Sequence, residues 1–270
     1  MTPTHFPDAA AGYRPQFVRQ VLDDALGQGA RVYGIAGLQG TGKSTLSAQV
    51  AALAESEGRR VAVLSIDDFY LDQDERQQLA REVHPLLATR GPPGTHDVTL
   101  ACETIDALLA GRQVALPQFD KIDDRRLPRD AWPVVRDCDL VILEGWFLKT
   151  PPQDPAALAV PLNALEREQD PDGTWRRYCN DALAHDYGPL WRRIDRMLFL
   201  QGPAFDVVPG WRWQQEQTLQ AANPGRQAMS RPQVDRFVQF FERTSRQALD
   251  TLPGIAERTI RIDAHRDPIP

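Results

Sequence analysis

Cysteine, long apolar runs and targeting signals are scarce or absent in this chain. Its three cysteines, Cys102, Cys138 and Cys179, are far apart and odd in number, which argues against a disulfide framework or a zinc site. No apolar run approaches the length of a membrane-spanning helix, and the N-terminus has no basic segment followed by an apolar one. The sequence therefore predicts a protein of a reducing, cytoplasmic compartment with no membrane partner.

Positive charge is also in short supply. The chain has 31 basic and 37 acidic residues, a net charge of −6, so bulk electrostatic binding of nucleic acid is disfavoured. Only three basic residues are lysines, Lys43, Lys121 and Lys149, and the other 28 are arginines. Arginine clusters are therefore poor indicators of function here, whereas each lysine is informative.

What is present is an alternation of strand and helix patterns over 270 residues. Residues 84–97 form a loop rich in proline and glycine, and 150–171, with five prolines, predict an irregular insert. Buried strands are predicted at 31–37, 60–66, 139–145, 196–202 and 259–263, and helices at 14–27, 43–56, 74–83, 99–111, 174–193, 211–222 and 232–250. We expect an α/β fold, a parallel sheet covered by helices on both faces, in one domain spanning 1–270.

A phosphate-binding motif follows the first predicted strand. The segment matches G-x-x-x-x-G-K-[ST] at every fixed position and runs Gly37, Leu38, Gln39, Gly40, Thr41, Gly42, Lys43, Ser44. Its glycines let backbone N–H groups surround a phosphate, and the following helix adds its N-terminal dipole. Lys43 is expected to bridge the β- and γ-phosphates and Ser44 to hold Mg²⁺. We therefore expect ATP and Mg²⁺ as cofactors, with Thr45 completing the nucleotide-binding segment.

Acidic residues end two of the predicted strands. Asp67 and Asp68 follow the second strand, and Glu144 lies at the end of the third. The carboxyl ends of parallel strands meet at the edge where such sheets bind ligands. One carboxylate can hold Mg²⁺ and another can accept the proton of an attacking hydroxyl. We assign Glu144 to the metal and Asp67 to the proton, while Asp68 could equally cap the next segment.

These motifs together resemble the P-loop kinases of small metabolites, the group of uridine kinase, phosphoribulokinase and bacterial pantothenate kinase. The resemblance spans about residues 31–265 and rests on GLQGTGKST, SIDDFY, RGPPGTHD, LPQFDK and LEGWF. The later segments VPLNALE, WRWQQE and FxxFFERTSR are most similar to the plant-type D-glycerate 3-kinase family, which has bacterial and fungal relatives. Where those relatives often carry W-R-x-E-Q-E, this chain has Gln214 in place of a glutamate.

The resemblance implies a sheet in the order 2-3-1-4-5, a lid at about residues 203–231 and phosphorylation of D-glycerate to 3-phosphoglycerate. A lid arginine would contact the nucleotide; the candidates are Arg192, Arg193, Arg212 and Arg226, and we assign Arg212. The acceptor, a small hydroxy acid, is placed near a further set of side chains: Asp67, Tyr70, Arg90, His96, Asp97 and Lys121.

Plainer roles remain open for some of these residues. Thr95, His96 or Asp97 could cap the helix that follows, Lys121 could be a solvated charge, and Trp211 could pack the adenine or the core. The rival functions are another nucleoside, pantothenate or sugar kinase, a nucleotide-hydrolysing switch and a nucleic-acid kinase. The absence of an N-K-x-D guanine-reading segment and the negative charge count against the last two.

Overall fold

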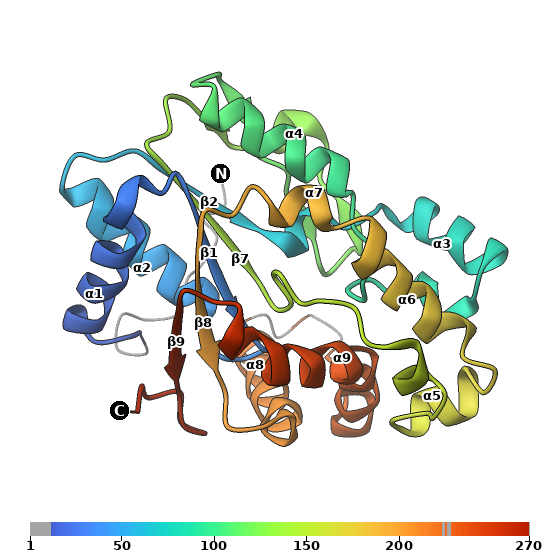
Figure 1. The fold of residues 1–270 in the computed structure, drawn as a ribbon. Helices are drawn as coiled ribbons and strands as arrows, with labels where there is room; N and C mark the ends of the chain where they lie inside the picture. Colours follow the sequence, from blue (N-terminus) through green and yellow to red (C-terminus); the bar gives the residue numbers. More distant parts are fainter. Residues whose placement is uncertain (1–11, 223–224, 226–227, 270) are drawn as a thin grey trace.

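The structure, a computed structural model, describes residues 12–222, 225 and 228–269 (Figure 1). Residues 1–11, where the sequence predicts no secretory signal, lie outside the described residues. So do residues 223–224 and 226–227 of the expected lid segment, Arg226 included. Within the described part of the chain, every helix is too short or too polar to span a bilayer.

Five parallel strands form the central sheet, which confirms the α/β class. Their order is β2-β7-β1-β8-β9, which is 2-3-1-4-5 when only the strands of this sheet are counted along the chain. The strands are β1 (Val32–Gly37), β2 (Val61–Ser65), β7 (Leu140–Gly145), β8 (Arg196–Gln201) and β9 (Arg258–Arg261).

Central strand β1 shows why helices cover both faces of the sheet. All six of its residues are buried, and successive side chains of a strand point to opposite faces. Tyr33 and Ile35 pack against α1 and α2, whereas Val32 and Ala36 belong to the core under α4, α6, α7 and α9 (Figure 1). The helices are α1 (Pro15–Leu26), α2 (Lys43–Ser56), α3 (Gln73–Glu82), α4 (Val98–Leu109), α5 (Ala164–Gln169), α6 (Thr174–His185), α7 (Gly188–Trp191), α8 (Val208–Ala222) and α9 (Arg231–Thr251).

Two predicted segments differ from the structure. The insert at 150–171 is not wholly irregular: it contains a 3₁₀ turn at Pro155–Leu158 and helix α5, which Asn163 begins by accepting a hydrogen bond from the Glu166 N–H at 3.0 Å. The single helix predicted at 174–193 is two helices. Pro189 in the first turn of α7 has no N–H to continue a helix, so α6 ends at His185.

In residues 12–222 and 228–269, four very short strands lie outside the main sheet and have no counterpart in the prediction. β3 (Val114–Ala115) pairs with β6 (Val134–Val135), and β4 (Phe119–Asp120) pairs with β5 (Arg125–Arg126), both antiparallel. Two residues are too few to carry a periodic signal. The β4–β5 hairpin matters for the site because Lys121 lies in its turn.

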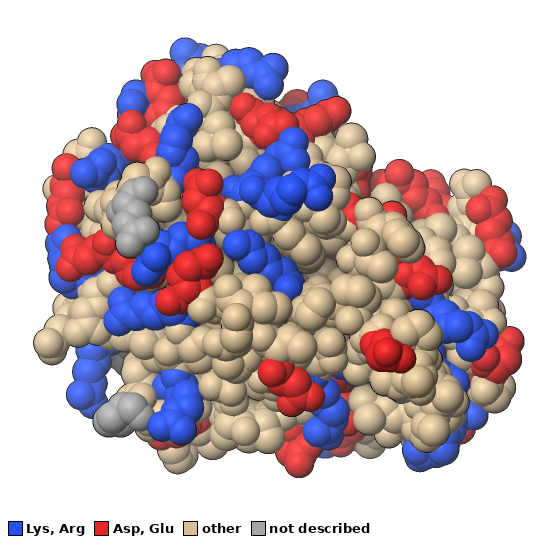
Figure 2. Space-filling model, viewed as in Figure 1, with Lys and Arg blue, Asp and Glu red and all other residues tan. Residues whose placement is uncertain are grey.

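Figure 2 shows acidic and basic side chains interspersed on the face in view.

Candidate active site

The P-loop joins the buried strand β1 to helix α2. Gly40 and Gly42 both have φ of +86°, a left-handed conformation that glycine adopts at little cost. α2 begins at Lys43, and among the described residues no side chain caps it. Its first N–H groups are thus available to an anion, as a phosphate cradle requires. The side-chain amide atoms of Gln39, a residue of this loop, are buried with no partner among the described residues, which fits a polar ligand there.

Ser44 and Glu144 meet at the start of α2. The Ser44 hydroxyl donates a hydrogen bond to Glu144 Oε1 at 2.8 Å, and Lys43 Nζ lies 3.9 Å from Glu144 Oε2. Oε2 is buried and accepts no hydrogen bond from the described residues. A hydroxyl and a buried carboxylate are oxygen ligands of the kind Mg²⁺ prefers, and Mg²⁺ commonly takes only one or two protein carboxylates with water and phosphate oxygens. These residues therefore fit the metal expected from the sequence.

Asp67 lies just past the end of β2, in the 3₁₀ turn Ile66–Phe69, and forms an ion pair with Lys121. The distance from Lys121 Nζ to Asp67 Oδ2 is 2.6 Å. Burial raises the pKa of Asp67, but the charge and hydrogen bond of Lys121, helped by Tyr70 and Lys43, outweigh it and hold that pKa well below its usual range. The Lys121 side chain is 54% exposed, so an incoming anion could reach it.

Asp68 is in a different electrostatic state from its neighbour. Its Oδ1 accepts a hydrogen bond from the Phe119 N–H at 3.3 Å, which ties β4 to the turn after β2. Burial, with the negative charges of Asp67 and Glu144, raises the pKa of Asp68 to about 7 despite the attraction of Lys121. Asp67 is therefore the carboxylate that is fully ionised at neutral pH.

His96, in the loop before α4, and Tyr70, just after the 3₁₀ turn Ile66–Phe69, lie next to each other and form an antiparallel bridge. The two rings are 4.9 Å apart, and burial lowers the pKa of His96 to about 4, so its imidazole is neutral at pH 7. Nδ1 lies 2.7 Å from the Tyr187 hydroxyl, which itself accepts a hydrogen bond from the Gly94 N–H. If Tyr187 donates to Nδ1, the ring proton is on Nε2, which is buried with no partner among the described residues. His96 can thus offer a hydrogen bond to an acceptor molecule.

Two other predicted acceptor residues have partners within the protein. Arg90 pairs with the Asp124 carboxylate and donates to the Lys121 carbonyl at 2.9 Å, so it supports the turn that carries Lys121. Asp97 caps α4 by accepting from the Leu100 N–H at 2.9 Å. Direct contact of either residue with an acceptor stays a prediction.

The predicted lid arginine lies on α8. Arg212 lies 3.4 Å from Glu216 and over the ring of Phe237, and its contact with the nucleotide stays a prediction. Arg193 is bound to Asp106 through two hydrogen bonds of 2.6 and 2.7 Å, away from the P-loop. Trp211 is 3% exposed and lies against Gly40, so its ring is packed inside the protein beside the loop.

Sequence reasoning missed two residues that touch the P-loop. Tyr13 donates a hydrogen bond to the Thr41 carbonyl, and Arg266 donates one to the Gly40 carbonyl, each at 2.5 Å. In both hydrogen bonds the acceptor is a backbone carbonyl, and Arg266 is 226 positions from Gly40 in the sequence. No sequence pattern signals a contact of this kind.

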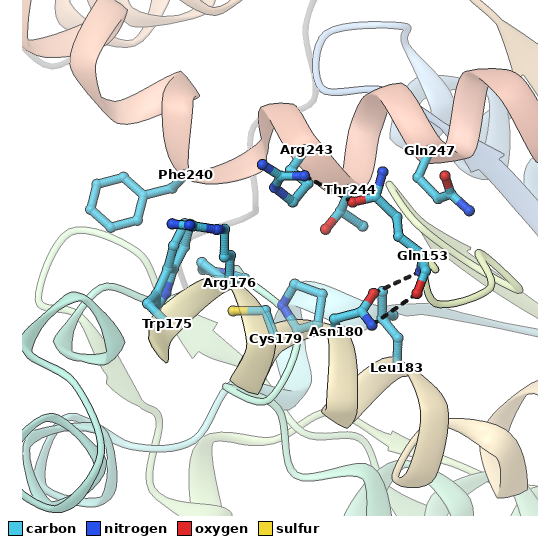
Figure 3. A pocket seen from close by; sticks show the side chains of 12 residues that line it. Gln153, Trp175, Arg176, Cys179, Asn180, Leu183, Phe240, Arg243, Thr244 and Gln247 are labelled. Atoms are coloured by element: carbon cyan, nitrogen blue, oxygen red, sulfur yellow. Dashed lines mark hydrogen bonds between the residues drawn. The ribbon is translucent and has the colours of Figure 1, made fainter. Parts of the chain in front are cut away.

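A separate pocket lies between α6 and α9 (Figure 3). The two arginines that line it form ion pairs within the protein: Arg176 with Asp170 at 2.9 Å, and Arg243 with Glu166 at 2.6 Å. The cavity measures about 20 Å³, room for a water molecule and too little for a metabolite. Pro92 and Pro93, from the loop that carries His96, form part of its wall.

Comparison with known proteins adds an independent finding. A family model described as "Methylmalonyl Co-A mutase-associated GTPase MeaB" matches residues 9–69, which contain the P-loop and β2 but less than a quarter of the chain. "Uncharacterized kinase mug58" of Schizosaccharomyces pombe is 33% identical over 220 residues, which cover 78% of this chain and 78% of that protein.

Two further similar proteins have names that state a substrate. "D-glycerate 3-kinase, chloroplastic" of Arabidopsis thaliana is 27% identical over 260 residues, covering 88% of this chain and 54% of that protein. The solved structure of D-glycerate 3-kinase from Cryptococcus neoformans var. grubii has a TM-score of 0.75 at 25% identity and covers 94% of this chain and 96% of its own. The likeness to the solved structure therefore extends over both chains nearly in full.

Proposed function

The chain belongs to the kinase family of the Schizosaccharomyces pombe protein mug58, and on this premise we propose that it phosphorylates D-glycerate with ATP, releasing 3-phosphoglycerate and ADP. The observation that carries the proposal is the ion pair of Lys121 with Asp67 next to the P-loop. In this pair the Lys121 ammonium can bind a substrate carboxylate, and the Asp67 carboxylate can accept the proton of a substrate hydroxyl. Glycerate carries both a carboxylate and hydroxyl groups. The names of the plant and fungal relatives support the same substrate.

On the donor side, the cradle binds and orients the phosphates. The N–H groups at the start of α2 and the Lys43 ammonium face the β- and γ-phosphates in this proposal. Ser44 and Glu144 hold Mg²⁺, which when bound neutralises charge on the phosphate oxygens. The negative charge that develops during transfer is then stabilised by groups already in place, at no cost of reorganisation.

On the acceptor side, Asp67 takes the proton of the reacting hydroxyl. The hydroxyl oxygen forms a bond to the γ-phosphorus, the bond from that phosphorus to the bridging oxygen of ADP breaks, and the proton passes to an Asp67 oxygen. Asp67 is ionised at neutral pH because Lys121 lowers its pKa. A strong base is unnecessary because phosphoryl transfer goes through a loose transition state in which the nucleophile forms little bond.

Anionic acceptors suit this site better than neutral ones. Glycerate has almost no apolar surface to bury, so its affinity must come from charge and hydrogen bonds. Lys121 supplies the charge, and the free edge of His96 supplies a hydrogen bond. Glycerol would leave the cation without its second partner and should be a poor acceptor.

All three cysteines are free and buried, which supports a cytoplasmic location as part of the proposal.

A coupled assay of ADP release tests the function. The acceptors are D-glycerate, L-glycerate, glycerol, uridine and pantothenate, with Lys43→Ala as the inactive control and mass spectrometry to identify the product. We expect the highest kcat/KM for D-glycerate. A tenfold preference for another acceptor would replace the substrate and leave the kinase. Equal ADP release with and without every acceptor would instead favour a nucleotide-hydrolysing switch, as the match of residues 9–69 to a GTPase model would suggest.

A further inference from the structure

Side chains near the two ends of the described chain hold adjacent carbonyls of the P-loop. The Tyr13 hydroxyl donates to the Thr41 carbonyl, and Arg266 Nε donates to the Gly40 carbonyl, both at 2.5 Å. Neither residue belongs to the motif at 37–44.

Tyr13 is itself fixed to the helix that follows the loop. Its backbone N–H donates to Gln49 Oε1 at 2.9 Å, and its carbonyl accepts from Gln49 Nε2 at 3.0 Å. Its ring packs on Phe17 of α1 with centroids 5.1 Å apart. A Cβ added to Gly42 would lie 3.2 Å from the Tyr13 hydroxyl, so the two groups are in close contact. Tyr13 is therefore a rigid donor held by α1 and α2.

Arg266 is fixed by α8. Its guanidinium lies over the Trp211 ring, 5.2 Å from the centroid, and its Nη2 donates to Gln214 Oε1 at 2.9 Å. Trp211 in turn donates from Nε1 to the Ala264 carbonyl at 2.8 Å, which ties the segment after β9 to α8. Gln214 is the position where relatives often carry glutamate, and here its amide oxygen serves as the acceptor for Arg266.

Peptide geometry links these bonds to the cradle. A peptide group is planar, and in its trans form the C=O and the following N–H point in opposite directions. Holding the Thr41 carbonyl therefore orients the Gly42 N–H away from Tyr13. Holding the Gly40 carbonyl likewise orients the Thr41 N–H, which donates to the Leu38 carbonyl at 3.2 Å and closes the loop. Gly40 and Gly42 have no side chain to restrict their backbone, so these bonds limit the conformations open to them.

We propose that Tyr13 and Arg266 are positioning residues for the phosphates of ATP. They set the peptide groups of residues 40–42 before the nucleotide arrives, so less conformational freedom is lost on binding. The Arg266 charge also adds to the positive potential around the loop. The proposal concerns the nucleotide donor and holds for any acceptor, so it goes beyond the assignment of glycerate.

The test compares two loop variants and two control variants, with Arg266→Lys as a conservative replacement. Tyr13→Phe and Arg266→Gln each remove one hydrogen bond to the loop. Tyr33→Phe and Arg258→Gln are matched controls, because Tyr33 donates to Asp24 at 2.6 Å and Arg258 donates to the Gln20 carbonyl at 3.0 Å, both away from the loop. The readouts are the Kd of Mg²⁺–ADP by calorimetry, which needs no acceptor, the KM for ATP and for the acceptor, and the melting temperature.

We expect Tyr13→Phe and Arg266→Gln to raise the Kd for ADP and the KM for ATP by about 3- to 10-fold, the net worth of one hydrogen bond. The KM for the acceptor should stay within twofold, and Arg266→Lys should recover part of the affinity because an ammonium can still donate to the Gly40 carbonyl. The controls should bind ADP like the original protein. The proposal would be overturned if the two loop variants bound ADP as tightly as the original protein. It would also be overturned if control variants with the same melting temperature as the loop variants lost as much ADP affinity.

Discussion

Lys121 and Asp67, 54 positions apart in the sequence, form an ion pair in which Nζ and Oδ2 are 2.6 Å apart. One of only three lysines in the chain thus lies beside the carboxylate that follows β2. Two hydrogen bonds fix the backbone of the hairpin that carries Lys121: Arg90 donates to the Lys121 carbonyl, and Asp68 accepts from the Phe119 N–H. The lysine head is exposed while its backbone is fixed, which suits a group that exchanges partners with a substrate.

The first prediction follows from that arrangement. Lys121→Met removes the cation and keeps most of the stem, so the KM for glycerate should rise by at least tenfold because the carboxylate loses a charged partner. The KM for ATP should change by less than threefold. Arg125→Met is the matched control, since Arg125 is exposed on the same hairpin and contacts Gln73 at 3.4 Å. Equal effects of the two substitutions on glycerate would remove Lys121 from the acceptor site.

The second prediction distinguishes the catalytic roles of the neighbouring carboxylates Asp67 and Asp68. Asp67→Asn should lower kcat by about 10²- to 10⁴-fold, the usual range for loss of a general base, while ADP binding changes little. Asp68→Asn should keep most of the activity because its carboxyl group is tied to the backbone of Phe119. Steady-state kinetics of both variants decide the matter: if Asp68→Asn is the inactive one, the base has been misassigned.

The sheet and P-loop could be read from the sequence because their signals are local. The strand at 32–37 is a continuous apolar run, and α2 begins at the lysine of the motif, as predicted. Lys121, singled out by its rarity, does lie beside Asp67. The rest depends on contacts between distant segments: the pairing of Arg90 with Asp124, and the bonds of Tyr13 and Arg266 to backbone carbonyls, leave no periodic or motif signal.

Asp68 gives a prediction about stability and pH. Its pKa in the folded protein is about 7, above its ordinary value of 3.8, so between about pH 4 and 7 the folded state keeps a proton that the unfolded state releases. Its contribution to stability therefore falls as pH rises through this window. Asparagine does not titrate, so the melting temperature of Asp68→Asn relative to the original protein should rise between pH 5 and pH 8. A difference that stays constant over this range would contradict the raised pKa.

Glu144 provides a prediction for the metal. Glu144→Gln keeps a hydrogen-bond acceptor for Ser44 but replaces the charged Oε2 oxygen, which is buried and accepts no hydrogen bond from the described residues. A neutral amide is a poorer ligand for a hard cation, so the Mg²⁺ concentration for half-maximal activity should rise several-fold. The measurement is a Mg²⁺ titration at saturating ATP. If the titration curve does not move, Glu144 serves only to hold Ser44.

Gly40 tests how closely the loop depends on α8. A Cβ at this position would lie 2.5 Å from Trp211 Cβ, and φ is +86°, so alanine would have both a strained backbone and a clash. Gly58, which follows α2, has φ of +81° but nothing within 4 Å of an added Cβ. Gly40→Ala and Gly58→Ala therefore share a conformational cost of about 1–2 kcal/mol, the usual penalty for a left-handed residue with a side chain.

Only the Gly40 substitution should also displace the phosphate cradle. Its clash pushes the loop away from Trp211 and strains the hydrogen bond from Arg266 to the Gly40 carbonyl. We expect both variants to melt at lower temperature, with ADP affinity reduced at least tenfold in Gly40→Ala and unchanged in Gly58→Ala. Calorimetric titration with Mg²⁺–ADP gives the comparison. If Gly40→Ala binds ADP as tightly as Gly58→Ala, contact with α8 does not set the geometry of the P-loop.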